Sequence, residues 1–353
     1  MVKTPLLIVR ADANVEMGTG HVMRCLALAH AWQAAGGEVV FAIAEATPSV
    51  EARLSSEGVA ITRLRVLPNS VQDVKALTEL ARARGADWVI VDGYQFDNRF
   101  QMRIRDCGLK LLLVDDLGQC GEYSADFVLD QNVLATEQMY ANRRAHTQLL
   151  LGPRYAMLRC EFQGWRGWRR EIPRFGSKLL FTMGGSDPGN LTLRLIEALP
   201  GLRDLGLEIT VVAGGSNPQL AELQRAVHRL GVLVELAGSV MDMPALMAQS
   251  DIAVICSGGT TWELLYMGCA TLSYFRNPVQ GKIVSELDAR GTLKSLGAAE
   301  NFEADRLTAI VKEIAASQER RAKMAQLGRE LVDGQGPERV LRHLLPTLSR
   351  ISA

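Results

Sequence analysis

Residues 6–24 read LLIVRADANVEMGTGHVMR, and this stretch decides the fold expected for the chain. It opens with a short apolar run, typical of a buried strand. It then passes through two glycines, Gly18 and Gly20, into an amphipathic helical pattern. A strand, a glycine-rich turn and a helix in succession begin a βαβ unit with parallel strands. The turn therefore lies where α/β folds bind their ligands.

The same alternation continues along the whole chain. In the first half we expect further strands at 39–44, 88–92, 110–115 and 127–129, and helices at 21–35 and 71–84. In the second half we expect strands at 179–183, 208–213, 232–236, 252–256 and 271–275, and helices at 191–199, 218–230, 243–249, 260–267 and 282–289. Such alternation implies parallel strands joined by right-handed crossovers.

The length predicts two domains, because 353 residues exceed one ordinary core. We place the first Rossmann-like domain at 1–165 and the second at 176–353, with the last helix crossing back to the first. The segment 161–177 lacks clear periodicity and is interpreted as the linker. Two doubly wound domains of this kind bring the carboxyl ends of their strands to one interdomain cleft.

Composition excludes several classes of partner. Lys+Arg and Asp+Glu balance at 39 each, which gives no net attraction to nucleic acid. No apolar segment approaches the roughly 20 residues that cross a bilayer, and the first residues lack the pattern of a signal peptide. The six cysteines form no C-x-x-C pair and show no histidine spacing suited to zinc. We expect a cytoplasmic monomer without metal or cofactor.

His21 is the candidate catalytic base. It follows Gly18 and Gly20 in the first turn of the expected helix, with Arg24 one turn later. The positive helix N-terminus and Arg24 both disfavour imidazolium, so the pattern predicts a neutral imidazole, as a general base requires. The alternative is a histidine that merely caps or packs. The two glycines and the arginine at a strand-to-helix corner favour function.

Two further loops of this kind lie in the second half. The first contains Gly184, Gly185, Ser186 and Asp187, and the second runs from Ser257 through Gly258, Gly259, Thr260 and Thr261 to Glu263. Glycines and hydroxyls at a helix start suit a diphosphate, because they expose backbone N–H groups. A carboxylate one turn into the helix, such as Glu263, can accept hydrogen bonds from a ribose diol. Each loop alone is a weak signal and has an ordinary turn as its alternative.

Polar residues also follow two other expected strands. Asp92-Gly93-Tyr94 ends one strand, and Tyr94 either contacts a sugar or packs. Asp115-Asp116 ends another and either pairs with substrate or caps a turn. If His21 only orients substrate, the base is sought among Asp12, Asp92 and Asp115.

At these loops the chain resembles a known family. The matching motifs are R-x-D-x-x-x-x-M-G-x-G-H-x-x-R-C-L-x-L-A at 10–29, V-D-G-Y at 91–94, D-D at 115–116, G-P-x-Y-A-x-L-R-x-E-F at 152–162, M-G-G-S-D at 183–187, the loop at 257–263 and D-G-Q-G-x-x-R-V at 333–340. They are similar to those of the UDP-2,4-diacetamido-2,4,6-trideoxy-β-L-altropyranose hydrolases of pseudaminic acid biosynthesis. Spore-coat polysaccharide proteins share the same motifs, and the glycine loops occur throughout the GT-B superfamily.

The resemblance implies a GT-B fold, with UDP held by the second domain and the sugar facing the first. It carries the catalytic role onto His21. It carries substrate contacts onto Arg10, Asp12, Gly18, Gly20, Arg24, Tyr94, Gly184, Gly185, Ser186, Asp187, Ser257, Gly258, Gly259, Thr260, Thr261, Glu263 and Gln280. The chain departs from the family after the strand ending at Phe275, where Val279 rather than asparagine precedes Gln280.

Three functions follow from this pattern. The first is hydrolysis of a UDP-sugar by water with inversion at the anomeric carbon. The second is a GT-B glycosyltransferase that uses the same UDP-sugar with a sugar or lipid acceptor. The third is a non-catalytic sugar-nucleotide binding module, which would need no base beside its glycines.

Overall fold

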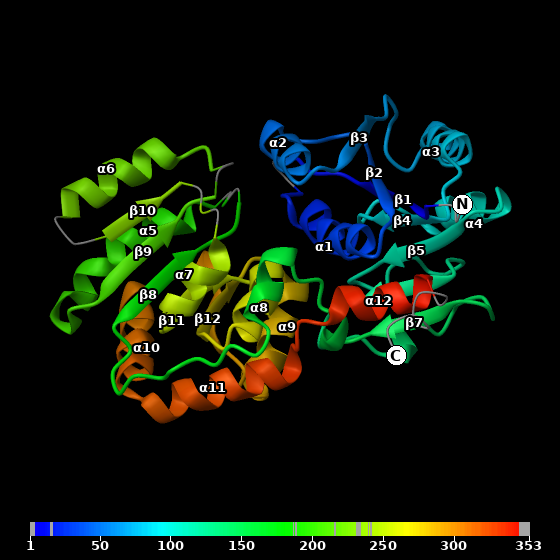
Figure 1. Cartoon of the computed structure of the whole chain (residues 1–353). Coiled ribbons are helices and arrows are strands. Elements are labelled where there is room, and N and C mark those ends of the chain that lie inside the picture. Colours follow the sequence, from blue (N-terminus) through cyan, green and yellow to red (C-terminus); the bar gives the residue numbers. More distant parts are fainter. Residues whose placement is uncertain are drawn as a thin grey trace. The chain divides into compact units, whose positions relative to one another are not determined.

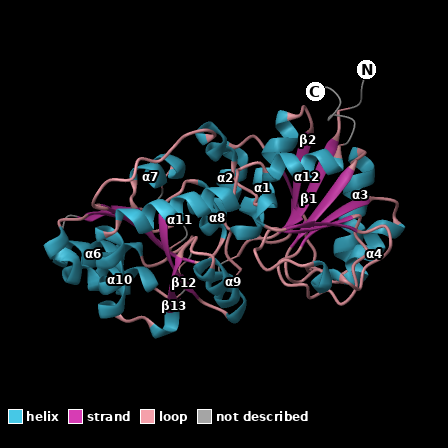
Figure 2. Ribbon diagram, turned by 90° about the horizontal axis from the view of Figure 1, so that it is seen from below, coloured by secondary structure: helices cyan, strands magenta, loops and turns pink. Residues whose placement is uncertain are grey.

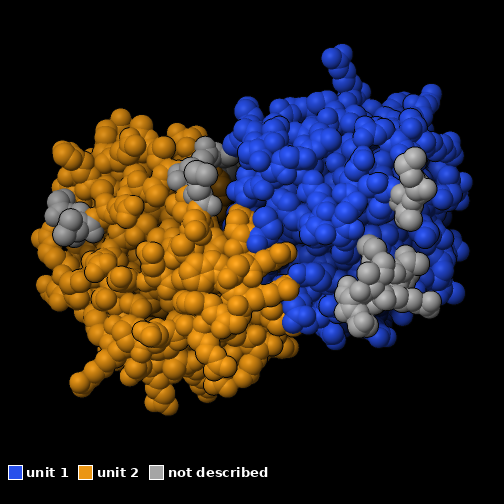
Figure 3. All heavy atoms as spheres, in the orientation of Figure 1, with its two compact units in different colours: residues 1–160, 334–353 blue, residues 161–333 orange. Residues whose placement is uncertain are grey.

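The computed structural model describes residues 4–14, 17–185, 187, 189–214, 217–230, 234–238, 240 and 242–345. The chain divides into two compact units, coloured separately in Figure 3. Unit 1 comprises residues 1–160 and 334–353, and unit 2 comprises residues 161–333. No helix among the described residues combines the length and the apolar character needed to span a membrane.

Unit 1 is built on a parallel sheet of seven strands in the order β3-β2-β1-β4-β5-β6-β7. Its strands are β1 (Leu6–Ala11), β2 (Glu38–Ile43), β3 (Ala60–Arg63), β4 (Trp88–Asp92), β5 (Lys110–Val114), β6 (Phe127–Asp130) and β7 (Gln148–Leu151). Its helices are α1 (Gly20–Ala34), α2 (Pro48–Ser56), α3 (Val71–Arg84), α4 (Asn98–Asp106) and α12 (Gly336–Leu344), and two short 3-10 helices lie at Glu137–Tyr140 and Pro153–Tyr155.

Alternation along each strand gives this sheet two buried faces. In β1, Leu7 and Val9 belong to the core cluster that includes residues of α1, α2 and α12, whereas Leu6 and Ile8 belong to the cluster formed with α3 and α4. Figure 2 shows α1 and α12 over one side of the sheet and α3 and α4 on the other. A doubly covered parallel sheet needs such continuously apolar strands, because neither face meets water.

Unit 2 repeats the plan with six parallel strands in the order β10-β9-β8-β11-β12-β13. Its strands are β8 (Lys178–Thr182), β9 (Glu208–Val212), β10 (Val234–Ala237), β11 (Ile252–Cys256), β12 (Ala270–Phe275) and β13 (Lys294–Ala298). Its helices are α5 (Leu191–Ala198), α6 (Leu220–Leu230), α7 (Met243–Gln249), α8 (Gly259–Tyr266), α9 (Pro278–Ala289), α10 (Ala304–Ala316) and α11 (Gln318–Leu331), with 3-10 helices at Cys160–Trp165, Leu199–Leu205 and Ala299–Asn301 (Figure 1).

The two doubly wound sheets confirm the α/β architecture expected from the sequence, and each predicted strand lies within two residues of an observed one at each end. The strands β3, β7 and β13 were not predicted. All three are edge strands with few buried residues, since β3 has none and β7 and β13 have one each, Leu150 and Leu296. The helices α2, α4, α10 and α11 were missed as well.

The segment expected to be an irregular linker begins as a 3-10 helix, Cys160–Trp165. The two units divide between Cys160 and Glu161. The final helix α12 clusters with unit 1, where Val340 and Leu344 join the core beneath α1. Trp88 at the start of β4 donates its indole N–H to the Leu344 carbonyl at 2.9 Å, which fixes the end of α12.

Close backbone contact at Gly336 docks α12 onto unit 1. A Cβ at Gly336 would lie 2.1 Å from the Ala156 carbonyl oxygen, so Gly336→Ala should lower the free energy of unfolding by about 1–3 kcal/mol through overpacking. Urea denaturation measures this change. Gly164→Ala is the control, because a Cβ there would meet no atom within 4 Å. Equal stability of the two variants would contradict the tight docking of α12.

Candidate functional site

The strand order of each sheet places its candidate loops at the same topological position. In unit 1 the order reverses between β1 and β4, and in unit 2 it reverses between β8 and β11. Ligands of doubly wound sheets bind outside the carboxyl ends of the strands at such a reversal. The loop after β1 leads into α1, whose second residue is His21, and the loop after β4 contains Tyr94. The loops after β8 and β11 contain Gly184 and Ser257.

His21 is the second residue of α1 and contacts the end of β4. Its Nδ1 lies 2.6 Å from Oδ1 of Asp92, the last residue of that strand. A carboxylate accepts, so Nδ1 carries the proton and Nε2 of the neutral ring keeps its lone pair. No described residue hydrogen-bonds to that Nε2. The arrangement therefore orients the imidazole as histidine–aspartate pairs do when the histidine serves as a base.

Arg24 holds the same carboxylate from one turn further along α1. Its Nε and one terminal nitrogen donate to the two oxygens of Asp92 at 2.6 and 2.7 Å, and its other terminal nitrogen donates to Asp116 at 2.5 Å. Burial alone would favour protonated Asp92, but the positive charge of Arg24, followed by His21, holds the pKa of Asp92 well below its usual range. Asp92 is thus ionised and fully buried.

This geometry changes the electrostatic argument made from the sequence. The sequence placed Arg24 beside His21 as a cation that disfavours imidazolium. In the structure the charge of Arg24 is shared by Asp92 and Asp116, and the carboxylate of Asp92 lies closer to the ring than any guanidinium nitrogen, the nearest being 3.2 Å from Nδ1. The environment of His21 therefore includes a counter-charge that can stabilise the imidazolium formed when the ring accepts a proton.

Tyr94 covers the exposed side of this cluster. Its ring meets that of His21 edge to face, with centroids 4.7 Å apart, and the side chain is 51% exposed. Partial burial, together with the charge of Asp116, raises the pKa of Tyr94 to about 12, so the phenol keeps its proton at neutral pH. A small hollow beside Tyr94 is lined by Arg24, Asp92 and Asp115. Tyr94 is the half-exposed residue of this group that can meet a ligand.

Behind Arg24 lies a buried network that the sequence did not reveal. Asn132 donates to Asp116 at 2.9 Å and to Asp130 at 2.9 Å, and Tyr140 donates to the other oxygen of Asp130 at 2.8 Å. Burial, assisted by the charge of Asp116, raises the pKa of Asp130 to about 7 despite these donors. The network fixes Asp116 and, through it, the direction of Arg24.

The other two acids considered as bases accept hydrogen bonds from groups within the protein. Asp115 accepts from the backbone N–H groups of Leu117 and Gly118 and from the hydroxyl of Tyr123. Asp12 accepts from the backbone N–H groups of Ala44 and Glu45. Both carboxylates thus organise the loops at the carboxyl edge of the sheet.

Arg10 is a buried structural group. Its side chain is fully enclosed and donates to both oxygens of Asp73 at 2.9 and 3.0 Å and to Asp12 at 2.7 Å. With these donors turned inward, Arg10 positions Asp12 rather than presenting a guanidinium to a ligand.

The glycines before α1 shape its start. Gly18 adopts a φ of +79°, which favours glycine, and Gly20 is the first residue of α1.

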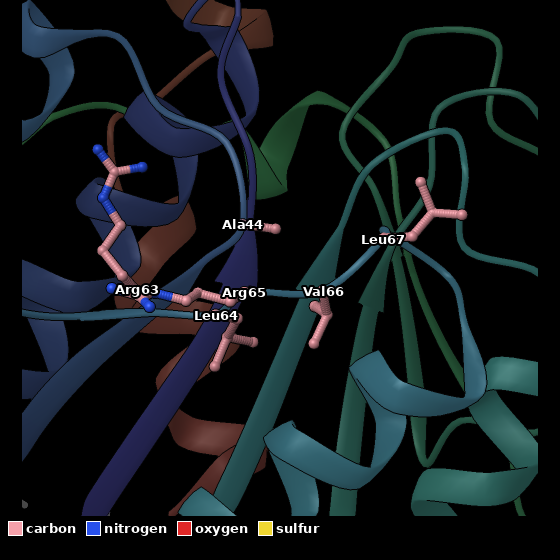
Figure 4. A pocket seen from close by; sticks show the side chains of 6 residues that line it. All are labelled: Ala44, Arg63, Leu64, Arg65, Val66 and Leu67. Carbon is pink, nitrogen blue, oxygen red and sulfur yellow. The ribbon is translucent and has the colours of Figure 1, made fainter.

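A roomier hollow of unit 1 lies away from His21, at the ends of β2 and β3. It is lined by Ala44 and by residues 63–67. Figure 4 shows Arg63 and Arg65 on one side and Val66 and Leu67 on the other. Arg63 is paired with Glu51. The lining contains no carboxylate or imidazole, so the hollow offers no base of its own.

In unit 2 the loop after β8 lies close against the backbone at Gly214. Gly184 has a φ of +88°, and a Cβ at Gly214 would lie 2.4 Å from the Cα of Gly185. Asp187 is buried and accepts from the backbone of Leu191 and Thr192 at the start of α5 and from Arg276 at 2.7 Å. Asp187 therefore holds the helix start. Ser186 lies outside the described residues.

The loop after β11 leads directly into α8. The backbone N–H of Gly258 donates to the Thr261 hydroxyl at 3.3 Å, and Ser257 and Thr261 are buried, whereas Thr260 is partly exposed. Glu263 is half-buried one turn into the helix. Gln280 lies on α9 and accepts from the backbone N–H of Arg276 at 2.9 Å. Gly259 opens α8, so its first amides face the loop, as an anion site requires.

Comparisons with known proteins identify distant relatives but do not assign the chain to a family. No family model matches the sequence. An uncharacterized protein, MJ1062 of Methanocaldococcus jannaschii, is 25% identical over 278 residues, or 76% of this chain and 55% of that protein. The spore coat polysaccharide biosynthesis protein SpsG of Bacillus subtilis is 26% identical over 200 residues, or 56% of this chain and 58% of that protein. The chain spans just over half the length of these relatives.

Solved structures confirm the fold class. S. aureus MnaA in complex with UDP has a TM-score of 0.68 at 15% identity, covering 98% of this chain and 97% of that one. The spinosyn rhamnosyltransferase SpnG complexed with thymidine diphosphate has a TM-score of 0.65 at 17% identity, covering 97% and 100%. At such low identity the likeness concerns the fold alone. The chain has the GT-B fold that its sequence led us to expect.

The raised pKa of Asp130 predicts a pH-dependent stability. A carboxyl group near 4 when unfolded and near 7 when folded stabilises the protein at low pH, and this contribution is lost as the pH rises from about 4 to 7, by on the order of 4 kcal/mol. Asp130→Asn cannot titrate. The free energy of unfolding of the wild type, minus that of Asp130→Asn, should therefore fall across this range in urea titrations. A difference independent of pH would contradict it.

Proposed function

We propose that this chain hydrolyses a UDP-linked sugar, with His21 as the general base. The single observation that carries the proposal is the pairing of His21 with buried, ionised Asp92 at the strand reversal of unit 1, which leaves Nε2 without a described partner. The GT-B fold, the likeness to SpsG and the nucleoside diphosphates named with two structural neighbours support a nucleotide sugar. The motifs favour UDP-2,4-diacetamido-2,4,6-trideoxy-β-L-altrose.

The proposed reaction is a single displacement. Nε2 of His21 takes a proton from water as the water oxygen attacks the anomeric carbon, the bond to UDP breaks, and the configuration inverts. Asp92 stabilises the imidazolium that forms, and Arg24 keeps Asp92 ionised and in place. Tyr94, half-exposed above the ring, contacts the sugar.

The leaving group is held in the proposal by unit 2. UDP leaves readily once its diphosphate is neutralised, and the amides at the start of α8 and beside Gly184 can supply that stabilisation. Glu263, one turn into α8, accepts from the ribose hydroxyls.

The alternative is a glycosyltransferase in which the same base deprotonates an acceptor hydroxyl. The transferase among the structural neighbours makes this the second candidate. Incubation of the purified protein with candidate UDP-sugars and no acceptor separates the possibilities. UDP release with a free sugar supports hydrolysis, release only after an acceptor is added supports transfer, and binding without release supports a binding module.

Substitution of His21 tests the base. His21→Ala and His21→Asn should each lower the rate of UDP release about 10²–10⁴-fold, because neither side chain accepts a proton at neutral pH. The affinity of both variants for UDP, measured by calorimetry, should equal that of the wild type. A chelator should not change the activity of the wild type. His228→Ala, on the exposed face of α6, is the control and should alter neither quantity. Near-normal turnover by His21→Asn would reduce His21 to an orienting residue.

Substitution of Glu263 tests the nucleotide site. Glu263→Ala should weaken UDP binding by about 1–3 kcal/mol through loss of charge-assisted hydrogen bonds. Glu319→Ala is the control, since Glu319 is an exposed glutamate near the start of another helix, α11. Isothermal titration with UDP measures both. If the two variants bind UDP as tightly as the wild type, Glu263 is not a ribose contact.

A further inference from the structure

Three side chains with metal-binding atoms converge in unit 1 away from His21. They are His30 of α1, Glu57 at the end of α2 and Cys160, the last residue before unit 2, and their ligand atoms all lie within 4.8 Å of one another. His30 Nε2 is 3.3 Å from Glu57 Oε2. Their positions, separated by 27 and 103 residues along the chain, form no local zinc motif.

The spacing of these atoms suits a tetrahedral cation. Nitrogen and oxygen ligands at about 2.0–2.1 Å from a tetrahedral Zn²⁺ lie about 3.3 Å apart, which is the separation found between His30 and Glu57. A thiolate at about 2.3 Å from the same ion would lie about 3.6 Å from the nitrogen. The ligand atoms of the cluster all lie within 4.8 Å of one another, so binding of the ion would draw the thiolate closer to the imidazole nitrogen.

Burial and charge also favour a divalent ion. The side chains of His30 and Glu57 are 10% and 24% exposed, and Cys160 is partly buried. This leaves an entry path while excluding most competing water. A glutamate and a thiolate supply two negative charges against one Zn²⁺. Arg53, which contacts the other oxygen of Glu57 at 2.6 Å, orients that carboxylate.

We propose that His30, Glu57 and Cys160 form a binding site for Zn²⁺, with water as the fourth ligand. Nitrogen, oxygen and sulfur together match the preference of Zn²⁺ and exclude Mg²⁺ and Ca²⁺, which take oxygen ligands. On binding, the Cys160 thiol loses its proton to solvent and the sulfur bonds the metal. The site ties α1 and α2 to the point where the chain leaves unit 1.

The site is separate from the proposed base. His30 follows His21 by nine residues on α1, which is about 13 Å along the helix axis. The metal therefore stabilises unit 1 without contact with His21. Its loss should lower the melting temperature and leave UDP release intact, so the zinc site and the hydrolase proposal fail independently of each other.

Cobalt substitution tests the proposal in the full-length protein. After treatment with a chelator and dialysis, addition of Co²⁺ should produce the visible bands of tetrahedral cobalt and a near-ultraviolet thiolate-to-cobalt band, saturating at one ion per chain. Zn²⁺ should displace it. Cys160→Ser should remove the thiolate band and weaken binding more than about 100-fold, since loss of a ligand exceeds the effect of an outer partner. Cys107→Ser is the control, because Cys107 is a partly buried cysteine outside the cluster; it should change neither the thiolate band nor the affinity for Co²⁺.

A second variant guards against misfolding of the first. His30→Gln should also weaken Co²⁺ binding and abolish the rise in melting temperature that Zn²⁺ gives the wild type. The proposal is overturned if the wild type shows no tetrahedral cobalt spectrum, if the thiolate band persists in Cys160→Ser, or if His30→Gln binds Co²⁺ as tightly as the wild type.

Discussion

The site of unit 1 depends on the pairing of the Asp92 carboxylate with Arg24 and His21. The carboxylate lies at the end of a fully buried strand, where an unpaired charge would cost several kcal/mol. Arg24 and His21 compensate that cost, and both belong to the first two turns of α1. One pairing therefore fixes the helix against β4 and sets the orientation of the imidazole. Removal of Arg24 would take away the cation that pairs with the buried charge of Asp92.

The compensation extends beyond this pair. Arg24 also binds Asp116, and Asn132 joins Asp116 to the buried carboxyl of Asp130. Burial, assisted by the charge of Asp116, raises the pKa of Asp130. The network thus places two carboxyl groups, those of Asp92 and Asp116, against Arg24, and beyond them a third, that of Asp130, whose pKa is raised to about 7.

Sequence reasoning predicted the fold well because strands that are buried on both faces are continuously apolar. It also placed His21 and Arg24 at the start of the first helix and Tyr94 just after a strand, since a glycine-flanked turn after a strand is a local signal. It could not pair His21 with Asp92, because the contact joins residues 71 positions apart and depends on strand order. The aspartate at the end of β4 was visible in the sequence, but only as an alternative base.

The motif around Arg10 shows a different limit. The family resemblance implied a substrate contact at Arg10, and periodicity alone gives this side chain no buried partner. Asp73, which binds it, lies on α3 and is 63 positions away. Burial of the strand forced the guanidinium to be satisfied within the protein, since a buried charge needs paired donors and acceptors. The pair in turn holds Asp12 beneath the loop after β2.

The two histidines of α1, His21 and His30, are proposed for two different roles, general base and metal ligand. A general base must keep one ring nitrogen available, and a metal ligand must commit one. At His21 the carboxylate contacts Nδ1, which leaves Nε2 for the proton transfer that we propose. At His30, Nε2 faces a second carboxylate and a thiol, the groups that would share a cation. The partners around each imidazole, rather than the residue type, decide its chemistry, and those partners come from strands and turns distant in the sequence.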